Sequence, residues 1–174
     1  MALRLAVSGS RAWPRACRWY LLAMLVVALD QWTKVLAEDL LRYGEPRVVT
    51  GFFNLTLLYN KGAAFSLLSD AGGWQHWLFS GIAAVVGMVL AVWLYRQPPA
   101  ARLEPLALAL VLGGAVGNLI DRLRLGHVVD FIQLHYRELY WPAFNLADSA
   151  ITLGAGLLIL LLLRRSEAGA DDER

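Results

Sequence analysis

Four long apolar stretches constrain the fold of this chain more than any other feature. They cover about residues 19–37, 74–95, 105–123 and 143–163. The hydrocarbon core of a bilayer is about 30 Å thick, and a helix needs about 20 mostly apolar residues to cross it. With 58% hydrophobic and only 17% charged residues, the 174-residue chain is too apolar for an ordinary soluble domain. We therefore expect a single α-helical membrane domain with four transmembrane helices.

The first apolar stretch shares one feature with a signal peptide, because basic residues precede it. It nevertheless runs on through Asp30 and Lys34 without a clear small-residue cleavage site, and three further apolar stretches follow it. A secretory signal ends at such a cleavage site after a short apolar run. We therefore expect the first stretch to be a retained span.

Arginines gather before the first span, between the second and third spans, and after the fourth. The first group holds four arginines, the second Arg96 and Arg102, and the third Arg164 and Arg165. Because short basic segments stay on the cytoplasmic side of a membrane, both termini are predicted to face the cytoplasm. The polar tail, residues 166–174, has no apolar face, and we expect it to be disordered.

Two segments, residues 38–73 and 124–142, are then predicted to lie outside the cytoplasm. Residues 47–59 are rich in β-branched and aromatic side chains, with partial alternation and a glycine break, which favours a small strand platform. Residues 131–141 mix aromatic and aliphatic side chains with charges, a pattern typical of an amphipathic segment on the membrane interface.

Polar residues in and beside the spans converge on one level of the predicted membrane. A charged group near hydrocarbon costs at least about 2.5 kcal/mol, so such residues mark a functional site by default. The first and third spans run outward and the fourth runs inward, which brings their polar residues to the outer leaflet, within reach of the loop aspartate Asp130. The residues are Asp30, Lys34, Asn118, Asp121, Arg122, Asp130, Asn145 and Asp148. Asp130 and Asp148 are the candidates for a catalytic pair.

Some of these residues also have simpler interpretations. Asp148 is suited to the first turn of a helix capped by Asn145, where the helix dipole favours an acid. Lys34 is suited to snorkelling toward the interface. Asp121 opposes the dipole at a helix C-terminus, which indicates that it holds a cation or an amide elsewhere.

Other chemistries find little support in the sequence. The single cysteine, Cys17, excludes an intrachain disulfide and a cysteine metal cluster, and the three histidines lack metal-ligand spacing. No basic strip interleaved with aromatic residues suggests a nucleic-acid partner. Gly113, Gly114 and Gly117 have the small-residue spacing of close helix packing. From the cysteine and histidine patterns, we expect no metal and no cofactor.

Five sequence blocks, taken together and in order, resemble the lipoprotein signal peptidases, also called signal peptidase II. They extend from the first span to the fourth, and none departs from the family pattern at a motif position. The blocks are Asp30-Gln31-Trp32-Thr33-Lys34, residues 60–65, residues 113–122, Val128-Val129-Asp130-Phe131 and Phe144-Asn145-Leu146-Ala147-Asp148.

The resemblance implies a bacterial inner-membrane aspartic endopeptidase, which removes the signal peptide of a prolipoprotein before its diacylglyceryl-modified cysteine. It implies that Asp130 and Asp148 form the catalytic dyad, toward the periplasmic leaflet. It also implies an extracytoplasmic β-cradle after the first span, and an amphipathic helix over the active site before the fourth span. The residues implied to support or line the site are Asn60, Asn118, Asp121, Arg122 and Asn145, with Asp30 and Lys34 matching positions that matter for stability or activity.

The implied partners are the lipidated prolipoprotein, membrane lipid and globomycin-type inhibitors. Two close carboxylates share a proton, so one can draw a proton from a water while the other donates one to the scissile carbonyl. The main rival is a small proton- or ion-coupled transporter subunit, because intramembrane acids also mark ion pathways. A pathway needs polar residues through both leaflets, whereas residues 21–29 and 151–163 are almost purely apolar.

Overall fold

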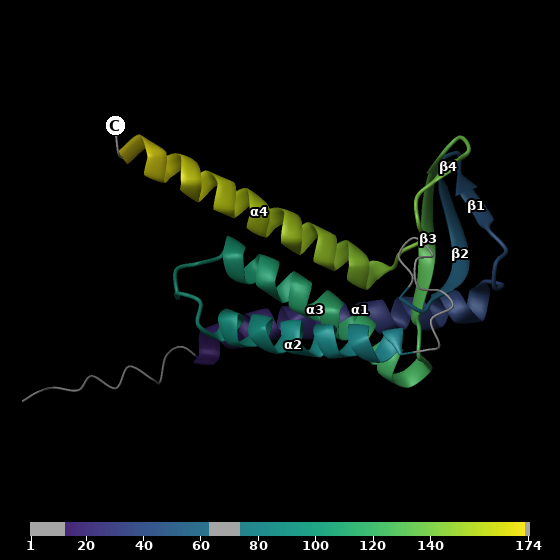
Figure 1. The fold of residues 1–174 in the computed structure, drawn as a ribbon, viewed down its shortest axis with the longest axis horizontal. Helices are drawn as coiled ribbons and strands as arrows, with labels where there is room; N and C mark the ends of the chain where they lie inside the picture. Colours follow the sequence, from purple (N-terminus) through teal and green to yellow (C-terminus); the bar gives the residue numbers. More distant parts are fainter. Residues whose placement is uncertain (1–12, 63–73, 173–174) are drawn as a thin grey trace, which may run out of the picture.

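The computed structural model describes residues 13–62 and 74–172. Within them the chain forms four helices, with a small sheet at one end of the helices (Figure 1). The helices are α1 (Trp13–Leu40), α2 (Gln75–Tyr95), α3 (Leu103–Leu125) and α4 (Leu146–Asp172). The strands are β1 (Arg47–Thr50), β2 (Phe53–Asn60), β3 (Val128–Tyr136) and β4 (Leu139–Tyr140). Residues 63–65 of the second sequence block, and the arginines at 4 and 11, lie outside the described residues.

The helices coincide with the four predicted spans. In the described part of the chain, four helical segments are long and apolar enough to cross a membrane: Ala16–Leu40, Trp77–Tyr95, Leu103–Leu125 and Leu146–Arg164. The fourth helix begins at Leu146 rather than near residue 143, because Asn145 caps its first turn. The prediction of four apolar helices is therefore confirmed.

The third helix is the centre of the bundle, since α3 packs against α1, α2 and α4. Its glycines permit this contact. A Cβ on Gly114 would overlap the carbonyl oxygen of Ala147 on α4, and one on Gly113 would lie 2.7 Å from the carbonyl oxygen of Ala23 on α1. Because neither position has room for a side chain, the predicted role of these glycines in close helix packing is confirmed.

The sheet is built from the two segments that the sequence predicts to lie outside the cytoplasm. Strands β1 and β2 come from the first segment, and β3 and β4 come from the second. Its strand order is β1-β2-β3-β4, and all neighbours are antiparallel. Strand β2 pairs with β3 in a register that sets Asn60 opposite Val128 and Leu58 opposite Asp130. A small sheet was expected after the first span. The structure adds to it strand β3, which follows α3 in the sequence. This pairing carries Asp130 to the end of the helix bundle.

The prediction of an amphipathic helix before the fourth span is wrong, because residues 128–136 and 139–140 in this part of the chain are strands. The reason lies in pairing: the edge of β2 offers unpaired backbone groups, and the β-branched and aromatic residues of β3 suit a pleated surface. The apolar side chains that suggested an interfacial segment remain exposed, among them Tyr136, Leu139 and Trp141.

The expected disorder of the C-terminal tail is also wrong for residues 166–172, because α4 continues through Asp172. Extending an existing helix needs no new nucleus, and each added residue gains a backbone hydrogen bond. Glutamate and alanine in this stretch favour the helix. A polar composition without an apolar face therefore did not prevent helix formation here.

We predict that Gly114→Ala destabilises the protein by about 1–3 kcal/mol, the usual cost of inserting a methyl group into a well-packed interface. The control is Gly81→Ala on α2, where an added Cβ meets nothing within 4 Å. Thermal unfolding in detergent should show a lower midpoint for the first variant and an equal or slightly higher one for the second. Equal midpoints for both would contradict the close approach of α3 and α4.

Candidate active site

Asp130 lies on β3 and is almost fully buried, with 2% of its surface exposed. Its two carboxylate oxygens accept hydrogen bonds from two amides: Oδ1 from Asn145 Nδ2 at 2.8 Å, and Oδ2 from Asn60 Nδ2 at 3.1 Å. The backbone N–H of Gly62 donates to Asn60 Oδ1 at 2.9 Å, which turns the Nδ2 of Asn60 toward Asp130. Each oxygen of this carboxyl group is therefore held by a hydrogen bond from a side-chain amide.

Asp148 lies in the first turn of α4 and is partly buried. Its Oδ2 accepts from the backbone N–H of Asn145 at 3.3 Å, while Asn145 Oδ1 accepts from the backbone N–H of Asp148 at 2.9 Å. This reciprocal pair is a capping box, as the simpler interpretation of Asp148 predicted. The cap uses only one carboxylate oxygen, because Oδ1 accepts from Asn118 Nδ2 at 2.7 Å. Asp148 therefore belongs both to the helix cap and to the polar cluster.

Asn145 connects the two aspartates. Its backbone N–H contacts Asp148, and its side-chain amide contacts Asp130 Oδ1, the carbonyl oxygen of Val129 at 3.2 Å and Asn118 Oδ1 at 3.2 Å. The residue is completely buried. Since one side chain and its own backbone hold both acids, Asp130 and Asp148 are neighbours despite the residues that separate them in the sequence.

The electrostatics of Asp130 follow from this position. The pKa of Asp130 is raised to about 7: burial and then the nearby carboxylate of Asp148 raise it, while the hydrogen bonds from Asn60 and Asn145 oppose the shift. Loss of hydration dominates, because removing a charge from water disfavours the ionised form. Near neutral pH, Asp130 can therefore be found with or without its proton, as an acid–base group requires.

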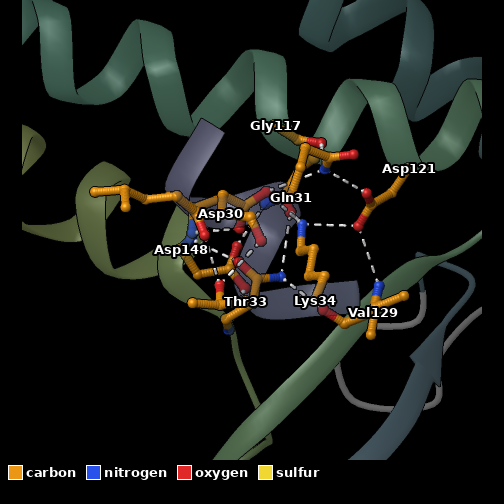
Figure 2. Close-up of polar contacts among 12 residues, drawn as sticks. Asp30, Gln31, Thr33, Lys34, Gly117, Asp121, Val129 and Asp148 are labelled. Carbon is orange, nitrogen blue, oxygen red and sulfur yellow. Dashed lines mark hydrogen bonds and ion pairs between the residues drawn. The ribbon is translucent and has the colours of Figure 1, made fainter. Parts of the chain in front are cut away.

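Lys34 and Asp121 form an ion pair, as Figure 2 shows. Lys34 Nζ lies 2.8 Å from Asp30 Oδ2, 2.7 Å from Asp121 Oδ2 and 3.0 Å from Asn118 Oδ1. Only 2% of Lys34 is exposed, so the snorkelling interpretation is wrong. Asp121 holds a cation, as predicted, and it also accepts from Gln31 Nε2 at 2.7 Å. The opposed helix dipole is thus offset by two donors from α1.

The buried face of α1 places these groups. Ala23, Val26, Asp30, Lys34 and Ala37 are all buried, and their spacing of three or four residues defines a single helical stripe. Polar and apolar residues of α1 therefore face the same neighbour, α3. Gln31 was not among the predicted site residues. A signal for it existed, because it is an amide beside Asp30 in a mostly apolar span.

Arg122 is attached to the cluster more loosely than the other predicted residues. Its Nη1 donates to the backbone oxygen of Asn118 at 3.4 Å, and its guanidinium lies 5.9 Å from the centre of the Phe79 ring. Among residues 13–62 and 74–172, no carboxylate forms an ion pair with it. The other predicted residues form one connected hydrogen-bond network. Arg122 lies at its edge, and most of its N–H donors are not used by this network.

The cluster does not resemble a metal centre. In the described ranges, no group of three or more His, Cys, Asp or Glu side chains is arranged to hold a metal ion. The carboxylate oxygens of Asp30, Asp121, Asp130 and Asp148 instead accept hydrogen bonds from amides, backbone N–H groups and Lys34. The arrangement is suited to proton transfer by two carboxyl groups.

We predict that Asp130→Asn removes a pH-dependent part of the stability. A carboxyl whose pKa is raised on folding stabilises the fold while protonated and loses this contribution as it ionises. The contribution is complete below the ordinary Asp pKa of about 3.9 and is lost as pH rises to about 7. Relative to the variant, the wild type should therefore lose thermal stability between these pH values. The exposed Asp39→Asn is the control, and parallel curves for wild type and Asp130→Asn would contradict the raised pKa.

Comparison with known proteins gives consistent matches over most of the chain. A family model described as signal peptidase (SPase) II matches residues 22–164. A lipoprotein signal peptidase of Acinetobacter baylyi is 53% identical over 148 residues, which cover 85% of this chain and 83% of the relative. One of Cupriavidus necator is 57% identical over 147 residues, with coverage of 84% and 83%. A solved structure titled as a bacterial membrane enzyme has a TM-score of 0.75 at 33% identity, covering 86% of this chain and 89% of that chain.

Proposed function

The chain belongs to the signal peptidase II family, and we propose that Asp130 and Asp148 are the catalytic pair with which it cleaves its substrate. Members of this family are proteases, and the activity is removal of signal peptides from prolipoproteins by a multi-pass bacterial membrane protein. The transporter alternative has no support from these comparisons. The observation that carries the assignment of the pair is the contact of Asn145 with both carboxylates.

The chemistry of the pair requires one proton shared between two carboxyl groups. Like charges close together cannot both ionise cheaply, so the pair titrates as a unit. The ionised member takes a proton from a water molecule, whose oxygen attacks the scissile carbonyl carbon. The protonated member donates to the carbonyl oxygen, and a proton then passes to the leaving nitrogen as the C–N bond breaks. The raised pKa of Asp130, about 7, supports this division of labour near neutral pH.

The remaining groups then act on the pair or on the substrate. Asn60, Asn118 and Asn145 donate hydrogen bonds that fix the carboxylate oxygens. Arg122 is partly buried and has no ion pair within the described residues, which leaves its fork of donors available for backbone carbonyl groups of an extended peptide. We assign it the role of holding the substrate near the pair.

The location follows from the same proposal. We place both termini on the cytoplasmic side of the inner membrane, so that the sheet and the acid pair lie toward the periplasmic leaflet. A substrate anchored there by its diacylglyceryl group keeps its acyl chains in the bilayer while the bond before the modified cysteine reaches the pair. Globomycin-type inhibitors are the proposed ligands of the same site.

We predict that Asp130→Asn and Asp148→Asn each lower the rate of cleavage by at least about 10²-fold, because general acid–base catalysis contributes about 10²–10⁴-fold. The assay is the mobility shift of a diacylglyceryl-modified prolipoprotein incubated with purified enzyme. Asp39→Asn, an exposed acid at the end of α1, is the matched control and should cleave at the wild-type rate. Wild-type rates in either pair variant, with folding intact, would rule out the pair.

We also predict that Arg122→Lys raises KM or lowers kcat/KM by about 10-fold, since a lysine cannot reproduce the planar fork of a guanidinium. The matched control is Arg42→Lys, because the side chain of Arg42 is 84% exposed and pairs only weakly with Glu45 at 4.0 Å. Steady-state kinetics on the same substrate measure both variants. An Arg122→Lys enzyme with unchanged kinetics would show that the guanidinium does not hold the substrate.

A further inference from the structure

A buried ionic group lies beside the acid pair and is joined to it by no direct hydrogen bond or ion pair. It consists of Asp30, Lys34 and Asp121, which we call the ionic triad, and its side chains are at most 3% exposed. Its formal charge is negative, with two carboxylates on one ammonium group. Replacing a buried ion pair with apolar residues is often neutral for stability, so the fold alone does not account for such a triad.

The hydrogen bonds from backbone N–H groups to the two triad acids follow a common rule. Asp30 Oδ1 accepts from the backbone N–H of Ala147 at 2.9 Å, and Ala147 directly precedes Asp148. Asp121 Oδ2 accepts from the backbone N–H of Val129 at 3.2 Å, and Val129 directly precedes Asp130. Each triad acid therefore holds the backbone immediately before one member of the acid pair.

Lys34 joins these two attachments into one. Its Nζ lies within 2.8 Å of a carboxylate oxygen of both triad acids, so the start of α4 and the start of β3 are fixed to the same ammonium group. Figure 2 shows Lys34 and Asp121 on this path, with Val129 at its end. The path connects two elements that carry the reacting carboxylates but belong to different parts of the fold.

Lys34 also sets the orientation of an amide. Asn118 Oδ1 accepts from Lys34 Nζ at 3.0 Å, and this leaves the Nδ2 of Asn118 to donate to Asp148 Oδ1 at 2.7 Å. An ammonium group is a donor only, so a reversed Asn118 amide would place two donors against each other. The lysine thereby keeps a donor directed at Asp148.

We propose that Lys34 is a positioning residue for the cleavage reaction, which sets the separation and orientation of Asp130 and Asp148 through Asp30, Asp121 and Asn118. This inference rests on the proposed function. Lys34 forms its hydrogen bond and ion pairs with Asn118, Asp30 and Asp121 and not with either member of the pair, so we do not count it as a catalytic residue. A displacement of about 1 Å at a reacting group can lower a rate by about 10²-fold, which gives the scale of the expected effect.

The first test is Lys34→Met, which keeps the length of the side chain and removes its charge. We expect kcat to fall by about 10²-fold with little change in KM. The charged groups that interact with Lys34 are Asp30 on its own helix, Asp121 on α3, Asp130 on β3 and Asp148 on α4. Because Lys34 lowers the pKa of Asp130, its loss should also move the pH profile of kcat to higher pH. Arg42→Met, which removes an exposed charge, is the control for both readouts.

A second variant separates positioning from folding, because Lys34→Met leaves two buried carboxylates without a cation. The triple variant Asp30→Asn, Lys34→Met, Asp121→Asn has no buried charge in the triad and should regain the wild-type thermal midpoint. We expect its kcat to remain at least about 10-fold below wild type, as the common ammonium group is missing. Thermal unfolding and single-turnover cleavage measure the two properties separately.

Each outcome bears on the proposal. Wild-type kcat and pH profile in Lys34→Met, or wild-type kcat in the triple variant, would overturn it. Failure of the triple variant to fold would also overturn it, since the triad would then be a requirement of the fold. A failure of the proposed function would look different, because Asp148→Asn would then remain active whatever the Lys34 variants do.

Discussion

The structure of the site depends on one hydrogen bond, from the side-chain amide of Asn145 to Oδ1 of Asp130 at 2.8 Å. In an apolar bundle there is little water to satisfy polar groups, so each must find its partner within the protein. Asn145 does this for a strand and a helix at once, because it also caps α4 through Asp148. The same residue that completes the helix end therefore brings the two carboxyl groups together.

Close helix packing makes this contact possible. The glycines of α3 let α1 and α4 approach its backbone, and an added Cβ at Gly117 would lie 2.6 Å from Asp30 Oδ2. The carboxylate of Asp30 thus occupies the volume that a side chain at position 117 would take. Small residues and buried charges are parts of one arrangement: Gly117 leaves room for the carboxylate of Asp30, which accepts a hydrogen bond from the backbone just before Asp148.

The sequence was sufficient for the helices and for most of the polar cluster, and insufficient for the strand that carries Asp130. The spans follow from local hydrophobicity, and the need of Asp121 for a donor follows from its place at a helix C-terminus. Strand β3 depends on pairing with β2, which lies about 70 residues away, and its aromatic and charged residues suit an interfacial helix equally well. Gln31 was missed although it lies beside Asp30 in the sequence, because its hydrogen bonds to Gly117 and Asp121 appear only when α1 packs on α3. The orientation in the membrane and the roles of the site residues stay predictions.

The most direct test of the central claim is the pH dependence of kcat/KM for cleavage of a diacylglyceryl-modified prolipoprotein by the wild-type enzyme. A pair that shares one proton predicts a bell-shaped profile, with activity lost at low pH when both carboxyls are protonated. The profile should also fall above about pH 7, where Asp130 ionises. A profile that is flat, or that rises through a single ionisation and stays high, would contradict catalysis by Asp130 and Asp148.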